Sequence, residues 1–149
     1  MPRKLSVVII VAMSCLLAAG HARADETIGV IRNSAGHATI GRAGRVIPAA
    51  VGTKLLVGDT LATGPGATMG VILRDNSTLS LGPASSLVIR KFLFAPAEGK
   101  LGLLVRVTRG TMAYLSGLIG RLAPESARFE TPVATIGTRG TRFAVRLDG

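Results

Sequence analysis

The chain has 149 residues, 18 Lys and Arg against 8 Asp and Glu, a net charge of +10, and a single cysteine, Cys15. This length suits one domain with a sizeable core, and one cysteine excludes a disulfide framework. The positive charge favours anionic partners, although solubility alone also accounts for such a surface.

Residues 1–24 have the pattern of a secretory signal peptide. A short basic start precedes an apolar run over 5–19, and Ala22 and Ala24 place small residues where a signal peptidase cuts. We expect cleavage after Ala24, which leaves 125 residues with 15 basic and 8 acidic side chains, a net charge of +7. The alternatives are an uncleaved anchor and lipid attachment at Cys15, but the run is shorter than the about 20 apolar residues that span a bilayer. Secretion makes nucleic acid the least available anionic partner, so we expect no nucleic-acid partner.

The rest of the chain, residues 25–149, predicts one all-β domain, because short runs rich in Val, Leu, Ile and Thr alternate with turn signals. The main candidate strands are 27–32, 38–42, 69–74, 78–81, 87–94, 101–108, 111–115, 129–131, 134–136 and 141–147. We expect a compact β-sandwich or a partly open barrel. A short β-solenoid is the alternative, but the spacing of the glycines is irregular.

Turn chemistry places the reversals between these strands. Ala43-Gly44-Arg45 and Asp75-Asn76-Ser77 predict tight turns, and Arg109-Gly110 predicts a third reversal. At most one short helix is expected, at residues 117–122, with Ser116 as its N-cap and Pro124 ending it.

The chain lacks the residue combinations of an enzyme. After the leader it contains one histidine, His37, no cysteine and no Gly-x-Ser-x-Gly motif. Carboxylates are few, and no two of them are marked as an acid–base pair. We therefore expect no catalytic residue, no metal ion and no cofactor.

A glycine motif interrupts the alternating pattern near the C-terminus: Gly137, Gly140 and Thr141 surround Arg139. A phosphate cradle is disfavoured because no Gly-Lys-Ser/Thr is present and a strand, not a helix, follows. We interpret the two glycines as a bulge or sharp corner between strand segments.

Arg139 would then point inward or across the corner, where its planar guanidinium can bind carbonyls or a carboxylate. Asp59 and Asp75 are its candidate partners, since each lies in a turn and a buried arginine needs a partner. The alternative is an exposed Arg139 that binds an anion.

Several segments together resemble the FecR domain. They are Gly-Asp-x-Leu-x-Thr-Gly with Gly58, Asp59, Thr63 and Gly64, then Leu-x-Asp-x-Ser-x-Leu with Asp75, a turn at Gly110, and Thr-Pro…Gly-x-Arg-Gly-Thr over 131–141. The resemblance implies a periplasmic, all-β, non-enzymatic domain. Founding members of the family relay the occupancy of an outer-membrane siderophore receptor, through a membrane helix, to a cytoplasmic anti-sigma segment. We expect neither segment here, so a sigma-factor role is not expected of this chain alone.

Two functions follow as expectations. The first is a periplasmic binding or scaffold module for an envelope protein partner, which would add a strand to the exposed strand at 141–147. The second is a binder of anionic envelope polysaccharide or of a lipid surface, with peripheral membrane contact. The second function rests on the basic C-terminal half, in which Arg106, Arg128, Arg142 and Arg146 are the candidate partner-binding residues.

Overall fold

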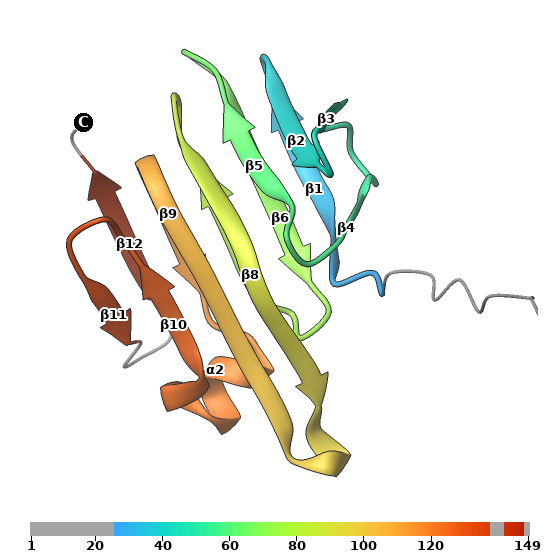
Figure 1. Ribbon diagram of the computed structural model, residues 1–149, viewed down its shortest axis with the longest axis vertical. Helices are drawn as coiled ribbons and strands as arrows, with labels where there is room; N and C mark the ends of the chain where they lie inside the picture. Colours follow the sequence, from blue (N-terminus) through green and yellow to red (C-terminus); the bar gives the residue numbers. More distant parts are fainter. Residues whose placement is uncertain (1–25, 138–141, 148–149) are drawn as a thin grey trace, which may run out of the picture.

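The computed structural model describes residues 26–137 and 142–147. The predicted signal peptide and three members of the glycine motif, Arg139, Gly140 and Thr141, lie outside these ranges. One curled sheet forms a half-barrel, and a short helix, α2 (Leu118–Leu122), lies near its lower end (Figure 1). The predicted all-β fold, the partly open barrel and the single short helix at 117–122 are confirmed, and the solenoid alternative is not adopted.

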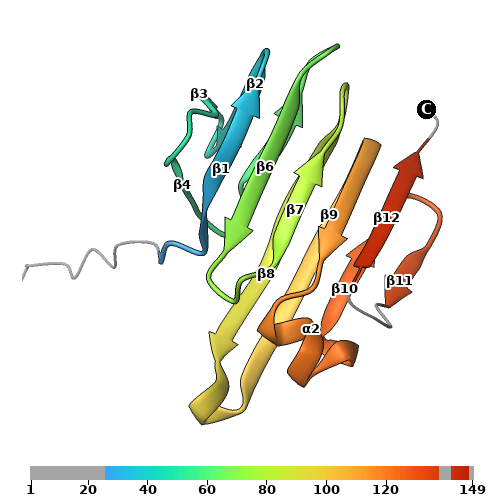
Figure 2. The same cartoon turned by 180° about the vertical axis from the view of Figure 1, so that it is seen from behind.

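The half-barrel has two layers, which we call the front sheet and the back sheet. The front sheet, nearer the viewer in Figure 1, contains β3 (Arg45–Pro48), β2 (Ala38–Arg42), β5 (Thr60–Thr63), β8 (Ser86–Ala95), the first part of β9 (Lys100–Leu115), β10 (Ala127–Glu130) and β11 (Thr135–Gly137). The back sheet, nearer the viewer in Figure 2, contains β4 (Lys54–Leu55), β1 (Gly29–Ala35), β6 (Thr68–Leu73), β7 (Thr78–Leu81), the last part of β9 and β12 (Arg142–Leu147). Neighbouring strands are antiparallel, except that β10 runs parallel to β9.

Strand β9 belongs to both sheets. Its residues 100–109 pair with β8, whereas residues 112–115 pair with β7 and residues 110–115 pair with β12. The reversal predicted at Arg109-Gly110 is therefore wrong. Gly110 has a φ of 81°, and β9 bends there and continues from the front sheet into the back sheet without reversing. No other residue fits, because a Cβ at Gly110 would lie 2.2 Å from Oγ of Ser85.

The other turns mostly follow the sequence. Ala43 and Gly44 join β2 to β3 with φ angles of 50° and 76°, and Asn76 joins β6 to β7 with a φ of 66°, as predicted. The first strand extends beyond its predicted end at residue 32 to Ala35, because an irregularity after Ile31 lets it stay paired with β6.

The core lies between the two layers and is filled by alternate side chains of each strand. Its largest fully buried members include Ile31, Ile40, Leu55, Leu61, Met69, Leu79, Leu87, Ile89, Leu103, Met112, Tyr114 and Phe129. Each such side chain stabilises the fold by roughly 1.5–3 kcal/mol. Rings continue across the layers, since Phe129 lies 4.7 Å from Tyr114 and 5.1 Å from Phe143 between centroids. Within residues 26–137 and 142–147, no helix is long and apolar enough to cross a membrane.

Candidate binding surfaces

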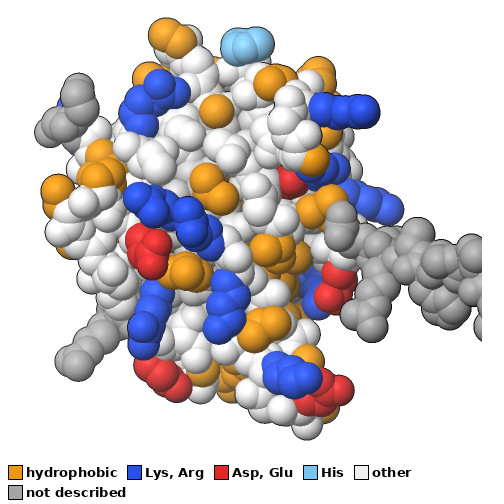
Figure 3. All heavy atoms as spheres, viewed as in Figure 1, with side chains coloured by type: hydrophobic (Ala, Val, Ile, Leu, Met, Phe, Trp, Pro, Cys, Tyr) orange, Lys and Arg blue, Asp and Glu red, His pale blue; other side chains and the backbone are white. Residues whose placement is uncertain are grey.

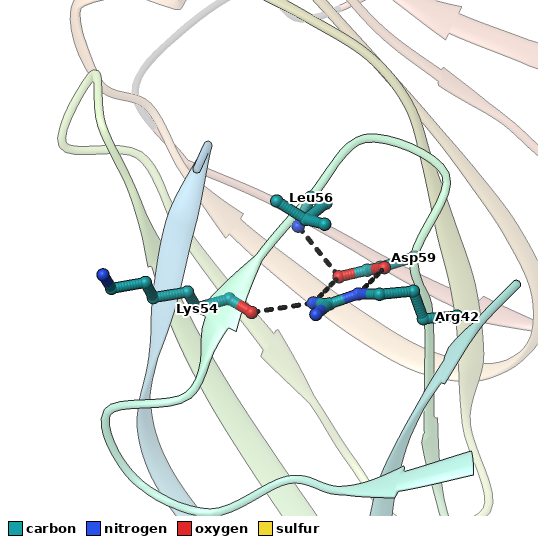
Figure 4. Close-up of polar contacts among 4 residues, drawn as sticks. All are labelled: Arg42, Lys54, Leu56 and Asp59. Atoms are coloured by element: carbon teal, nitrogen blue, oxygen red, sulfur yellow. Dashed lines mark hydrogen bonds and ion pairs between the residues drawn. The ribbon is translucent and has the colours of Figure 1, made fainter. Parts of the chain in front are cut away.

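Asp59 holds a structural clamp at the start of β5. It follows Gly58, whose φ of 91° allows the turn. The carboxylate is only 1% exposed, and it accepts hydrogen bonds from Nε of Arg42 at 2.9 Å and from Nη2 at 2.7 Å (Figure 4). The backbone N–H of Leu56 donates to the same carboxylate at 2.8 Å, and Nη2 of Arg42 also donates to the carbonyl of Lys54. Asp59 thus joins β2 to the loop that precedes β5.

Thr63 and Gly64 join two other turns. The hydroxyl of Thr63 donates to the carbonyl of Gly82 at 2.6 Å and accepts from the N–H of Ser85 at 2.9 Å. The carbonyl of Gly64 accepts from the N–H of Ala84 at 3.0 Å. These residues therefore hold the end of β5 against the β7–β8 connection, and their role is structural.

Asp75 is fully buried and caps α2 from a distant part of the chain. Its carboxylate accepts from the N–H and the hydroxyl of Ser77, at 3.0 and 2.6 Å, and from the N–H of Ile119 at 3.2 Å. Its backbone carbonyl accepts from the N–H of Leu118 at 2.8 Å. Two of the orphan N–H groups of the helix are satisfied in this way.

The predicted N-cap at Ser116 is wrong. Gly117 occupies the N-cap position, and no side chain of the helix start caps it. A Cβ at Gly117 would lie 2.3 Å from the carbonyl oxygen of Asp75, so only glycine allows the turn of β6–β7 to approach. The hydroxyl of Ser116 is buried without a hydrogen-bond partner in the described part of the chain.

The described strands on either side of the glycine motif belong to different sheets. Gly137 ends β11, which pairs with β10 in the front sheet, whereas β12 pairs with β9 in the back sheet. The bulge or corner that we interpret in the motif falls on residues 138–141, which lie outside the described ranges, so it stays a prediction. Arg139 lies outside the described residues, so the inward clamp stays a prediction. Both of its candidate partners, Asp59 and Asp75, have other donors, as described above.

The four predicted partner-binding arginines lie on two separate surfaces. Arg106 on β9 and Arg128 on β10 alternate with buried residues and face outward from the front sheet. Arg142 and Arg146 are exposed on the outer face of β12, in the back sheet. They do not form one site.

Two further cations join the front surface. Arg90 and Lys91 are both exposed on β8, where the pairing with β9 shifts between Ile89 and Lys91. We call Arg90, Lys91, Arg106 and Arg128 the basic cluster. Figure 3 shows Lys and Arg side chains gathered over this part of the front sheet. Two adjacent cations that interrupt the alternation of a strand are a sequence signal that could locate this bulge. The sequence alone did not mark them as binding residues.

Strand β12 is an edge of the back sheet, since β9 is the only strand among the described residues that pairs with it. The backbone groups of Thr111 bond toward β7 and the β7–β8 turn, through Gly82 and Ser85. Because the direction alternates along a strand, the groups of Ala113 also point toward β7. Its partner in register is Ala144, whose N–H and C=O therefore point away from β9.

Comparison with known proteins adds one match. A family profile described as FecR protein matches residues 59–149, more than half of the chain. The matched region begins at the clamp residue Asp59 and includes the helix-capping Asp75, the basic cluster and β12. The searches of curated proteins and of solved structures find no significant match.

Proposed function

Because the chain belongs to the FecR protein family, we propose that it is a non-enzymatic binding module of the periplasm, which docks an extended segment of an envelope protein partner. The family is a regulatory, signalling-related one and is typically associated with the cell envelope. This membership supports a signalling role in general terms. The docked segment and its position on this chain are our own proposal.

The observation that carries the proposal is the edge strand β12. The backbone N–H and C=O of Ala144 point away from β9, and edge groups of this kind can pair with a strand from another chain. Such pairing gives affinity through main-chain hydrogen bonds, so it does not require a deep pocket.

The outer face of β12 indicates which segments it favours. Arg142 and Arg146 are both exposed on the same face, two residues to either side of Ala144. Cross-strand pairs of opposite charge are favourable. An extended segment with acidic side chains opposite these arginines, and a small residue between them, would fit best.

A proline at Ala144 tests the proposal. Proline removes the N–H that points to the open side but leaves the bonds between β12 and β9, so Ala144→Pro should fold and lose the partner. Ala144→Ser keeps the N–H and serves as the matched control. Photo-crosslinking from β12 in envelope extracts should give one defined protein product with the parent and with Ala144→Ser, and none with Ala144→Pro.

The salt dependence provides the second measurement. Main-chain pairing is less sensitive to ionic strength than contacts between exposed charges, which are screened within about 8 Å at physiological salt. The crosslink should therefore persist at moderate salt. A folded Ala144→Pro variant that retains the full crosslinked product would contradict docking at this edge.

A further inference from the structure

The basic cluster is built by the pairing of three strands. The shift in register between Ile89 and Lys91 turns both Arg90 and Lys91 toward solvent, where regular alternation would bury one of them. Lys91 is opposite Leu104 on β9, and Leu104 is in turn opposite Arg128 on β10. Lys91 and Arg128 thus lie on the same face of the sheet, on either side of β9, with their backbones about 10 Å apart.

A groove of about 350 Å³ lies between these two cations. Gly102 and Leu104 form its floor, and Glu125 and Ser126 line it with Arg128. Gly102 leaves room for the lysine stem, because a Cβ there would lie only 3.0 Å from Cε of Lys91. The groove is therefore lined by residues of β8, β9 and β10 and by the short 3-10 turn at Pro124–Ser126 that precedes β10.

The cations of the cluster are available to a ligand. Nε of Arg128 donates to the carbonyl of Glu125 at 3.2 Å, which orients the guanidinium and leaves its terminal nitrogens for other acceptors. Arg90, Lys91 and Arg106 have no ion pair or hydrogen bond to any side chain in the ranges that the structure describes. Glu130 is opposite Arg106 in register, yet no ion pair forms between them.

We propose that the basic cluster is a second binding site, for an anionic polysaccharide whose carboxylate or phosphate groups contact Lys91 and Arg128. The site lies on the front sheet and is independent of the β12 edge in the back sheet. Guanidinium and ammonium groups separated by two strand spacings match charges that repeat along a chain. The groove floor, with a glycine and a leucine between the cations, accepts a narrow polymer.

A polysaccharide fits this face better than a lipid surface does. Two carboxylates, Glu125 and Glu130, flank the cations, and a continuous anionic membrane would face them too. A single polymer chain in the groove meets Glu125, which lines it, but can avoid Glu130, which does not. Phe92, the ring next to Lys91 on β8, is only 7% exposed and so offers no face for stacking on nucleobases.

Binding of dextran sulfate, measured by titration calorimetry with neutral dextran as the negative control, tests the site. The double variant Lys91→Gln/Arg128→Gln should bind about tenfold more weakly, and the slope of log affinity against log salt should fall by about two. The matched control is Arg45→Gln/Lys54→Gln, which removes two exposed cations elsewhere and should change affinity less than about twofold.

A variant that strengthens binding separates the site from a folding defect. Glu125→Gln removes a negative charge from the groove and should raise affinity for dextran sulfate a few-fold. Ala144→Pro should leave this affinity unchanged, so failure of the edge proposal and failure of this one can be told apart.

The remaining outcomes overturn the proposal. Equal losses in the two double variants would mean that overall charge attracts the polymer and that no site exists. Binding of vesicles of phosphatidylglycerol and phosphatidylcholine that depends on Lys91 and Arg128, without binding of dextran sulfate, would assign the cluster to a membrane surface.

Discussion

Arg42 and Asp59 form a bidentate pair in which the acid is buried and the base is half-exposed, at 1% and 29%. Without the base, the Asp59 carboxylate is buried with one remaining donor among the described residues, the N–H of Leu56. Arg42→Ala should therefore lower the free energy of unfolding by about 2–4 kcal/mol, less than for a fully buried pair. Urea denaturation followed by circular dichroism measures this loss.

Two further arginine variants serve as controls for this pair. Arg42→Lys keeps the charge but loses the two-pronged geometry, so an intermediate loss is expected. Arg45→Ala removes an exposed arginine of the same hairpin and should change stability by less than about 0.5 kcal/mol. An Arg42→Ala protein as stable as the parent would show that the pair contributes nothing.

Gly110 and Gly44 both have positive φ angles, 81° and 76°, but only Gly110 is in close contact with its surroundings. Gly44→Ala meets no atom within 4 Å and should cost about 1 kcal/mol, the backbone term alone. Gly110→Ala places its Cβ 2.6 Å from Cα of Ser85 and 2.7 Å from the carbonyl oxygen of Ala84, and backbone cannot move aside easily. Its loss should exceed that of Gly44→Ala by about 2 kcal/mol or more. Equal losses in urea denaturation would remove the steric argument.

The sequence predicted the parts of the fold that depend on neighbouring residues. Alternation located most strands, and the turns at Ala43-Gly44 and Asn76 follow from residues that tolerate positive φ. The same local rule failed at Gly110, because a positive φ in glycine serves equally for a reversal and for a bend within a continuous strand. Only the pairing of β9 with strands of both sheets distinguishes the two.

Long-range partners were the other part that sequence could not supply. Asp75 was identified as a motif residue, but its bond to Ile119 spans 44 positions, so Ser116 looked like the nearer cap. Asp59 was likewise identified without Arg42, which lies 17 positions away on another strand. The four candidate binding arginines could be predicted from the sequence. Their division between two sheets could not, because the order of strands in a sheet depends on long-range pairing.

Asp75→Ala should release the start of α2. The helix loses the acceptor for the N–H of Ile119, and Ser77 loses two bonds, so the free energy of unfolding should fall by about 2–3 kcal/mol. Hydrogen exchange at the Ile119 amide should quicken more than at amides in β5. Glu98→Ala, which removes an exposed acid, should do neither. Unchanged exchange at Ile119 would contradict the capping role.

Arg139→Ala tests the predicted clamp in the glycine motif. If Arg139 binds internal carbonyls or a carboxylate, the variant should lose about 1–3 kcal/mol of stability in thermal denaturation. Arg142→Ala, which removes an exposed arginine of the following strand, is the control and should lose little. A variant that melts like the parent yet binds dextran sulfate more weakly would instead assign Arg139 to anion binding.

Ser116→Ala should not destabilise the protein, although the residue is buried. Its hydroxyl has no hydrogen-bond partner within the described residues, so its removal ends a desolvation cost of about 1 kcal/mol against a small loss of packing.

The hydroxyl of Ser116 also restricts Gly120, where a Cβ would lie 2.0 Å from Oγ of Ser116. Gly120→Ala should therefore be costly in the parent and cheaper in the Ser116→Ala background. There the better helix propensity of alanine, about 1 kcal/mol, offsets the remaining contacts with Tyr114 and with Cβ of residue 116. Additive losses in this double-mutant cycle, measured by urea denaturation, would show that the Ser116 hydroxyl does not restrict residue 120.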